Sequence, residues 1–175
     1  MAQREMSSGV VEGVRELLID LLRETYWLEK KLVRMFDKFQ ELAAASSIKH
    51  VFADHSEQTQ THVSRLELVF NYLKLPTSTK VCPIISDIAD SSINIVKEST
   101  LDMSNRDTRL VLITERAKRY EIAVYHKLLR FSILLEYTSI EPILRRTLEE
   151  EQTANALFLS ISDGTIKDLM DSFAL

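Results

Sequence analysis

Apolar residues recur at helical spacing along three long stretches of the chain. The first stretch contains Leu18, Leu22, Leu32 and Phe36. Neighbouring members of this set are four or ten residues apart, which is about one or three helical turns, so all four lie on one face of an α-helix. The same spacing runs through residues 48–70 and 110–135. A long stripe of this kind is typical of a helix that buries one face against other helices, so the pattern predicts an all-α protein.

We expect five main helices. Pro83 and Pro142 fall in the first turns of the third and fifth helices, where a proline lacks only a hydrogen bond that the helix would not make. Gly164 is expected to break the chain before a short amphipathic tail, "TIKDLMDSF". The expected helices cover about residues 9–44, 47–73, 83–98, 105–137 and 140–160.

The connections between these helices predict the topology. A few residues join the first helix to the second, and a few join the fourth to the fifth, so each pair forms an antiparallel hairpin. About 30 residues separate the two hairpins, enough to run from one end of a bundle to the other. Two hairpins and one long crossover form the ferritin-like four-helix bundle, here with an additional short crossover helix. We expect one domain over residues 1–175, with the bundle at about 9–160 and the tail at 161–175; a generic five-helix bundle is the alternative.

Composition and charge narrow the class of protein. The chain has 175 residues with only three glycines and three prolines, which disfavours a β-rich fold. Its net charge is −4 and its basic residues are interspersed with acidic ones, so we expect no nucleic-acid partner. No signal peptide or apolar run of membrane-spanning length is visible, and the single cysteine, Cys82, fits a reducing compartment. These features predict a cytoplasmic protein without a membrane partner.

Polar residues interrupt the apolar stripes. They are Glu29 on the first helix, His62 on the second, Glu121 on the fourth, and Glu151 and Asn155 on the fifth. Counting back from the two expected turns puts Glu29 level with His62, and Glu121 level with Asn155, with Glu151 one turn away. Because a lone carboxylate in an apolar core is costly, we expect these side chains to share one layer.

The expected layer has two interpretations. A carboxylate-bridged di-metal site takes glutamates and histidines from all four helices of such a bundle, and carboxylate oxygens with imidazole suit iron or manganese. Its ligands here would be Glu29, His62, Glu121 and Glu151. Alternatively, each is an isolated polar residue at the edge of its stripe.

Four segments resemble the YciE/YciF family of ferritin-like, stress-associated bacterial proteins. The resemblance extends from Val14 to about Leu159, and it implies a ferritin-like bundle, a homodimer and a candidate di-metal centre. The matching segments are "LLIDLLRETYWLEKKL" (17–32), "HSEQTQTHVSRLE" (55–67), "YEIAVY" (120–125) and "TLEEEQTAN" (147–155).

The chain departs from the family pattern beside the candidate ligands. The family commonly has Glu where this chain has Gln58 and Lys118, and Asp where it has Asn155. Without metal, clustered carboxylates repel one another and some take up protons. An ammonium group at Lys118 would oppose a nearby metal ion and could pair with Glu121 instead. We therefore hypothesise that protein cations and hydrogen bonds have taken over the role of the metal.

Three functions remain open at this stage. The first is a non-enzymatic, stress-associated or structural protein with a modified core that binds either no metal or a rearranged one. The second is a di-iron or di-manganese protein that acts on oxygen or peroxide through Glu29, His62, Glu121 and Glu151. The third is a helical interaction module whose C-terminal tail binds a partner helix. No catalytic nucleophile or phosphate-binding loop is recognisable in the sequence.

Overall fold

Helices account for most of the described chain. The structure is a computed structural model that describes residues 8–83, 85–86 and 103–173. Within these residues, the all-α prediction is confirmed, and none of the helices is both long and apolar enough to cross a lipid bilayer. The four long helices are α1 (Ser8–Leu42), α2 (Ser46–Tyr72), α4 (Met103–Leu134) and α5 (Glu141–Phe173).

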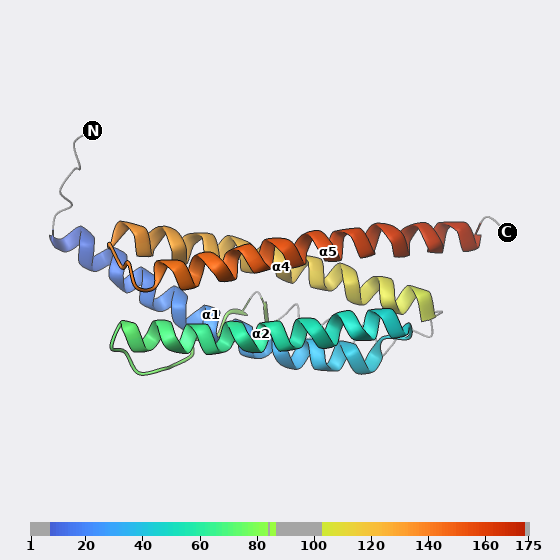
Figure 1. Cartoon of the computed structure of the whole chain (residues 1–175), viewed down its shortest axis with the longest axis horizontal. Coiled ribbons are helices and arrows are strands. Elements are labelled where there is room, and N and C mark those ends of the chain that lie inside the picture. Colours follow the sequence, from blue (N-terminus) through green and yellow to red (C-terminus); the bar gives the residue numbers. More distant parts are fainter. Residues whose placement is uncertain (1–7, 84, 87–102, 174–175) are drawn as a thin grey trace, which may run out of the picture.

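The helices form two antiparallel hairpins packed side by side (Figure 1). α1 pairs with α2 and α4 with α5, and the hairpins meet where α1 contacts α4 and α2 contacts α5. α2 and α4 run in the same direction, so the chain between them returns along the length of the bundle (Figure 1). This is the expected pair of hairpins with a long crossover. The expected helix over residues 83–98 lies largely outside the described residues; at its start, the Ser86 N–H donates to the Cys82 carbonyl at 3.1 Å.

An aspartate from α4 holds the turn between α1 and α2. Asp107 is buried, and its two carboxylate oxygens accept hydrogen bonds from the backbone N–H groups of Ala44 and Ala45, each at 2.8 Å. The N-cap residue of α2 is Ala45, whose side chain cannot cap the helix. The carboxylate therefore satisfies two backbone donors and places a negative charge near a helix N-terminus, where the helix dipole favours it.

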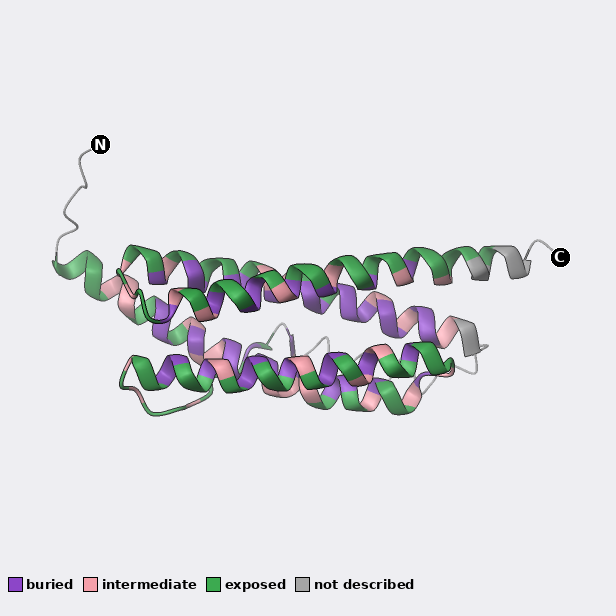
Figure 2. Ribbon diagram, viewed as in Figure 1, coloured by how far each residue is buried: buried purple, intermediate pink, exposed green. Residues whose placement is uncertain are grey.

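The buried core consists of two apolar clusters separated by a polar layer. One cluster joins the second half of α1 to the first halves of α2 and α4, around Phe36, Phe52 and Phe158. The other joins the first half of α1 to the second halves of α2 and α4 and the start of α5, around Leu22 and Leu128. Buried residues form stripes along the inward faces of the helices (Figure 2). The polar residues predicted to share a layer lie between the two clusters on every helix.

The expected break at Gly164 is wrong. α5 continues through this glycine to Phe173, so residues 161–173 extend the fifth helix rather than forming a separate tail. Ser162 is buried and Ile161 packs against the first apolar cluster, which anchors the helix close to the glycine. A glycine within a helix costs only about 1 kcal/mol relative to alanine, and burial of neighbouring side chains outweighs that cost.

Replacing Gly164 with alanine tests the continuous helix. A Cβ atom at this position meets no other atom within 4 Å, so Gly164→Ala should add helix propensity without a clash. We expect a stabilisation of the C-terminal end of α5 by about 1 kcal/mol, measured as slower amide hydrogen exchange at residues 161–170. The exposed Ala156→Gly variant is the reverse control on the same helix. Unchanged exchange in Gly164→Ala would contradict a helix that runs through this residue.

Candidate functional site

Five ionisable side chains meet in the middle of the bundle. They come from all four helices: Glu29 from α1, His62 from α2, Lys118 and Glu121 from α4, and Glu151 from α5. Each is 0% exposed to solvent. The structure thus brings together the four residues predicted as ligands and adds Lys118 to the same layer. Each lies on the inward stripe of its helix, which explains why side chains so distant in sequence converge.

Lys118 is the cation at the centre of this layer. Its Nζ lies 2.7 Å from Glu151 Oε2 and forms a second, shorter ion pair with Glu121 one helical turn away. Among the described residues, no other lysine or arginine is buried. The ammonium group therefore bridges the two acidic side chains of α4 and α5, as the sequence predicted for Glu121.

His62 is held by two consecutive glutamates of α5. Its Nε2 is 2.9 Å from Glu150 Oε2, and its Nδ1 is 2.9 Å from Glu151 Oε1. Glu29, the expected partner of His62, is more distant, with Oε1 at 3.9 Å from Nδ1. If Nε2–H donates to Glu150, a neutral ring turns the Nδ1 lone pair toward two carboxylates. A proton or a cation at Nδ1 would turn that repulsion into attraction.

Glu150 links the buried histidine to the surface. It is half-buried and was not among the residues expected in the layer, because it lies one position off the inward stripe of α5. Glu150 accepts hydrogen bonds from Arg65, with Nη2 at 2.9 Å from Oε1, and from Arg146 Nε at 3.0 Å. Burial opposes its ionisation, but these guanidinium groups and His62 outweigh burial and hold the pKa of Glu150 at about 2.

The ion pairs and burial move the pKa values of the three core glutamates in different directions. Burial alone would raise the pKa of Glu151, but the charge of Lys118, followed by His62, lowers it to about 2. Burial, reinforced by Glu151, raises the pKa of Glu121 to about 8. Burial, with added repulsion from Glu121 and Glu151, also raises the pKa of Glu29 well above its usual value. Glu151 is therefore the firmly ionised glutamate beside the ammonium, whereas burial favours the protonated forms of Glu29 and Glu121.

Tyr125 completes the environment of Glu29. This residue of α4 is fully buried, and its hydroxyl donates a hydrogen bond to Glu29 Oε1 at 2.5 Å. Glu29 Oε2 has no hydrogen-bond partner within the described part of the chain. A proton on Glu29 lowers the cost of this unpaired oxygen, because a neutral carboxyl group is cheaper to bury than a carboxylate.

The layer does not fit two metal ions, although it offers ligands for one. Glu29, His62 and Glu151 each present a ligand atom, and these atoms all lie within 4.8 Å of one another. Their carboxylate and imidazole donors suit iron or manganese. Glu121 is not part of this group, because its carboxylate faces the Lys118 ammonium. A second cation between α4 and α5 would have to displace that ammonium or sit against its charge.

The residues that depart from the family pattern lie around this layer. Gln58 is half-buried on α2, and Asn155 is half-buried on α5 with a buried Oδ1 that has no hydrogen-bond partner among the described residues. Arg119, next to Lys118 in sequence, lies off the layer and pairs with Glu115 at 3.1 Å. The buried thiol of Cys82 contacts the Tyr120 hydroxyl at 3.0 Å.

Comparisons with known proteins agree with the fold. The family model described as "Domain of unknown function (DUF892)" matches residues 13–170. Protein YciF of Escherichia coli (strain K12) is 28% identical over 146 residues, which are 83% of this chain and 87% of that protein. The crystal structure of the E. coli stress protein YciF has a TM-score of 0.82 and 26% identity, over 88% of this chain and 97% of that chain. YcfI from Rhodopseudomonas palustris has a TM-score of 0.80 and 26% identity, over 90% and 97% of the two chains. The resemblance to the YciE/YciF family is confirmed.

Removing the central ammonium should destabilise the bundle strongly. Lys118→Met leaves Glu121 and Glu151 buried without their cation, and we expect the free energy of unfolding at pH 7 to fall by about 3–5 kcal/mol in urea denaturation. The double variant Lys118→Met, Glu151→Gln should regain part of this loss, because it also removes the Glu151 charge that the single variant leaves unpaired. The exposed Lys127→Met variant of α4 is the matched control and should change stability by less than about 0.5 kcal/mol. A similar small effect for Lys118→Met would contradict the ion pairs.

Stability should fall as the pH rises from about 5 to 8. In this range folded Glu121, with a pKa of about 8, retains a proton that an unfolded glutamate, with a usual pKa of 4.5, has lost, and the raised pKa of Glu29 acts in the same direction. Folding then binds protons, and each such proton lowers the free energy of unfolding by about 1.4 kcal/mol per pH unit. Glu151 acts oppositely, because its lowered pKa gives stability that is lost only as the pH falls from 4.5 toward 2. Urea denaturation at several pH values measures the loss of stability in both pH ranges. Glu121→Gln should make the free energy of unfolding depend less on pH between about 5 and 8. A slope that survives this change undiminished would contradict the assignment to Glu121.

Proposed function

We propose, because this chain belongs to the family described as Domain of unknown function (DUF892), that it is a stress-associated structural protein of the YciF type whose acidic core is neutralised by Lys118. The stress association is carried over from the E. coli relative, whose structure is described as that of a stress protein. The structural role is inferred from the core, where the Lys118 ion pair stands at the position that a redox-active di-metal centre would occupy.

The position of Lys118 is the single observation that carries this proposal. A di-metal centre supplies about four positive charges to a carboxylate cluster. Here one ammonium lies between Glu121 and Glu151, and raised pKa values at Glu29 and Glu121 remove most of the remaining negative charge near neutral pH. Gln58 and Asn155 are uncharged where the family commonly has acids. The layer thus reaches near-neutrality from its own residues.

One mononuclear metal site is a second candidate. Glu29, His62 and Glu151 could hold a single iron or manganese ion. The Glu150 carboxylate on Nε2 of His62 supports it, since a metal-bound imidazole commonly donates its other N–H to a carboxylate. A single ion there would bind the Nδ1 lone pair of His62 and leave the contacts of Lys118 with Glu121 and Glu151 in place.

Metal analysis of the natural chain and of a variant with family-type acids tests both candidates. After loading with Mn²⁺ or anaerobic Fe²⁺ and gel filtration, the natural chain should retain no stoichiometric metal. A chain carrying Gln58→Glu, Lys118→Glu and Asn155→Asp should gain two ions, because it restores the acids and removes the ammonium. The control combines Gln58→Glu, Arg119→Glu and Asn155→Asp, which has the same net charge but changes a residue that is 64% exposed, and it should gain none.

The outcomes separate the candidates clearly. Two ions per natural chain would overturn the proposal and support the di-metal alternative. One ion per chain that is lost in His62→Gln would favour the mononuclear site. The homodimer and the cytoplasmic location stay proposals; sedimentation equilibrium of the same samples measures the first.

A further inference from the structure

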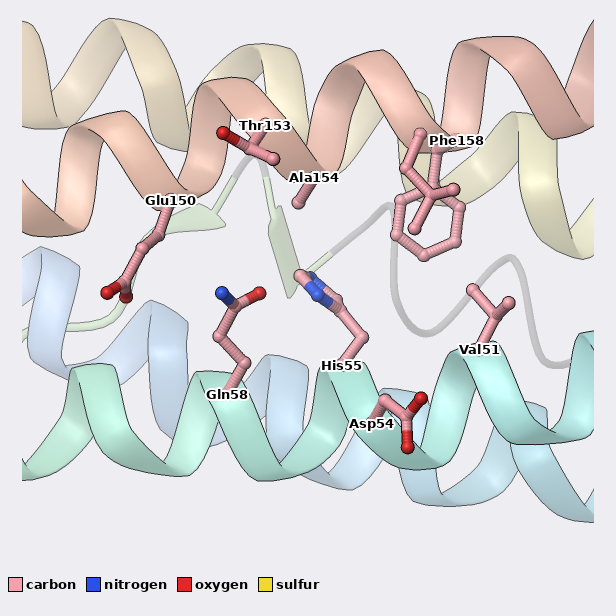
Figure 3. A pocket seen from close by; sticks show the side chains of 9 residues that line it. Val51, Asp54, His55, Gln58, Glu150, Thr153, Ala154 and Phe158 are labelled. Carbon is pink, nitrogen blue, oxygen red and sulfur yellow. The ribbon is translucent and has the colours of Figure 1, made fainter.

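A groove between α2 and α5 opens beside the polar layer. Its volume is about 340 Å³, and most of its wall surface is apolar and comes from Val51, Ala154, Leu157 and Phe158. Asp54, Thr153 and Leu157 are exposed at its mouth, so the groove is open to solvent. Figure 3 shows side chains from both helices facing one another across this space. A volume of this size falls within the range of small-molecule sites.

His55 places an unused hydrogen-bonding atom just behind the wall of the groove. Its side chain lines the groove although it is only 5% exposed, and its Nε2, which is itself buried, has no hydrogen-bond partner within the described residues. Figure 3 shows the imidazole directed from α2 toward Ala154 of α5, with the Gln58 amide beside it. A buried nitrogen without a partner is unfavourable, so a ligand that satisfies it gains affinity.

Two phenylalanines hold the imidazole in this orientation. The ring of His55 packs edge-on against Phe36, with centroids 4.7 Å apart, and against Phe158, with centroids 5.3 Å apart. Burial, reinforced by the charge of Lys118, lowers the pKa of His55 to about 3, so the ring is neutral under ordinary conditions. A neutral imidazole nitrogen is either a donor or an acceptor, and a hydroxyl group can pair with both forms.

The charges at the groove select against anions. Asp54 and Glu150 line it, and no basic side chain does. An apolar cavity of about 150 Å³ admits one benzene molecule, and this groove is more than twice as large. The size and the mainly apolar surface of the groove favour an uncharged molecule of about two fused rings, and the acidic edge disfavours an anion.

We propose that this groove is a binding site for a small uncharged aromatic alcohol, whose rings pack between α2 and α5 and whose hydroxyl pairs with His55 Nε2. The site is separate from the ion-paired layer, and it does not depend on whether the core binds metal. Gln58, which differs from the family pattern, contributes a neutral amide to the same wall. A carboxylate at that position would add a third negative charge to the groove.

Binding of 2-naphthol to the purified full chain tests the site. Equilibrium dialysis should show saturable binding with one molecule per chain. Naphthalene, which lacks the hydroxyl, should bind about fivefold more weakly, the usual effect of one hydrogen bond. 2-Naphthoate, which is anionic, should bind more weakly than 2-naphthol. Absence of saturable 2-naphthol binding, as when a second copy of the chain covers the groove, would overturn the proposal, and so would equal affinities for 2-naphthol and naphthalene.

Three variants place the ligand in the groove. Ala154→Leu fills the space between the helices and should abolish 2-naphthol binding, whereas Ala156→Leu, an exposed position two residues along α5, should leave it unchanged. His55→Leu should keep naphthalene binding and reduce the ratio of the two affinities to about one. Circular dichroism confirms that each variant is folded, and the His55→Leu ratio remains informative if Ala154→Leu is not. Undiminished binding by a folded Ala154→Leu variant would overturn the proposal.

Discussion

The burial of acidic side chains at the middle of the bundle requires a positive charge close by, and Lys118 provides it. Its ammonium reaches Glu121 on its own helix and Glu151 on the neighbouring one, so it can make both contacts only when α4 and α5 are correctly aligned. Replacing such a pair by apolar residues is often neutral for stability, whereas removing one partner is not. We infer that the layer contributes more to the alignment of the helices than to the overall stability of the bundle.

The same layer has two connections of different character. Toward the interior, Tyr125 and Lys118 bind the carboxylates in a region closed to water. Toward the surface, His62 is joined through Glu150 to Arg65 and Arg146, which lie on α2 and α5. Glu150 and Glu151 are consecutive residues and approach different nitrogens of one imidazole. These two contacts join α2 to α5 at the level of His62, whereas the neighbouring groove between the same helices stays open.

Most of the fold could be predicted from residue spacing, because the apolar stripes and the short connections leave few ways to pack four helices. The depth of Glu29, His62, Glu121 and Glu151 followed from the same spacing. The contacts of His62 could not be predicted in the same way. Counting residues back from a loop places a side chain only to within about one turn of helix, and Glu151 lies nearer to His62 than Glu29 does. The break expected at Gly164 was wrong because the free-energy cost of a glycine in a helix is smaller than the stabilisation from burying the neighbouring side chains Ser162 and Ile161. Glu150 was missed because a long side chain at the edge of a stripe can still reach inward.

The contact of Asp107 with the turn between α1 and α2 has a consequence for folding. The aspartate is 63 residues away in sequence from Ala44, whose backbone N–H it accepts. The first hairpin therefore obtains the partner for its turn only after the crossover has closed and α4 has arrived. Contacts between segments so far apart in sequence form slowly, because a long loop must be closed first. The two hairpins should consequently assemble as one cooperative unit, and a fragment ending after α2 would have a loosened turn.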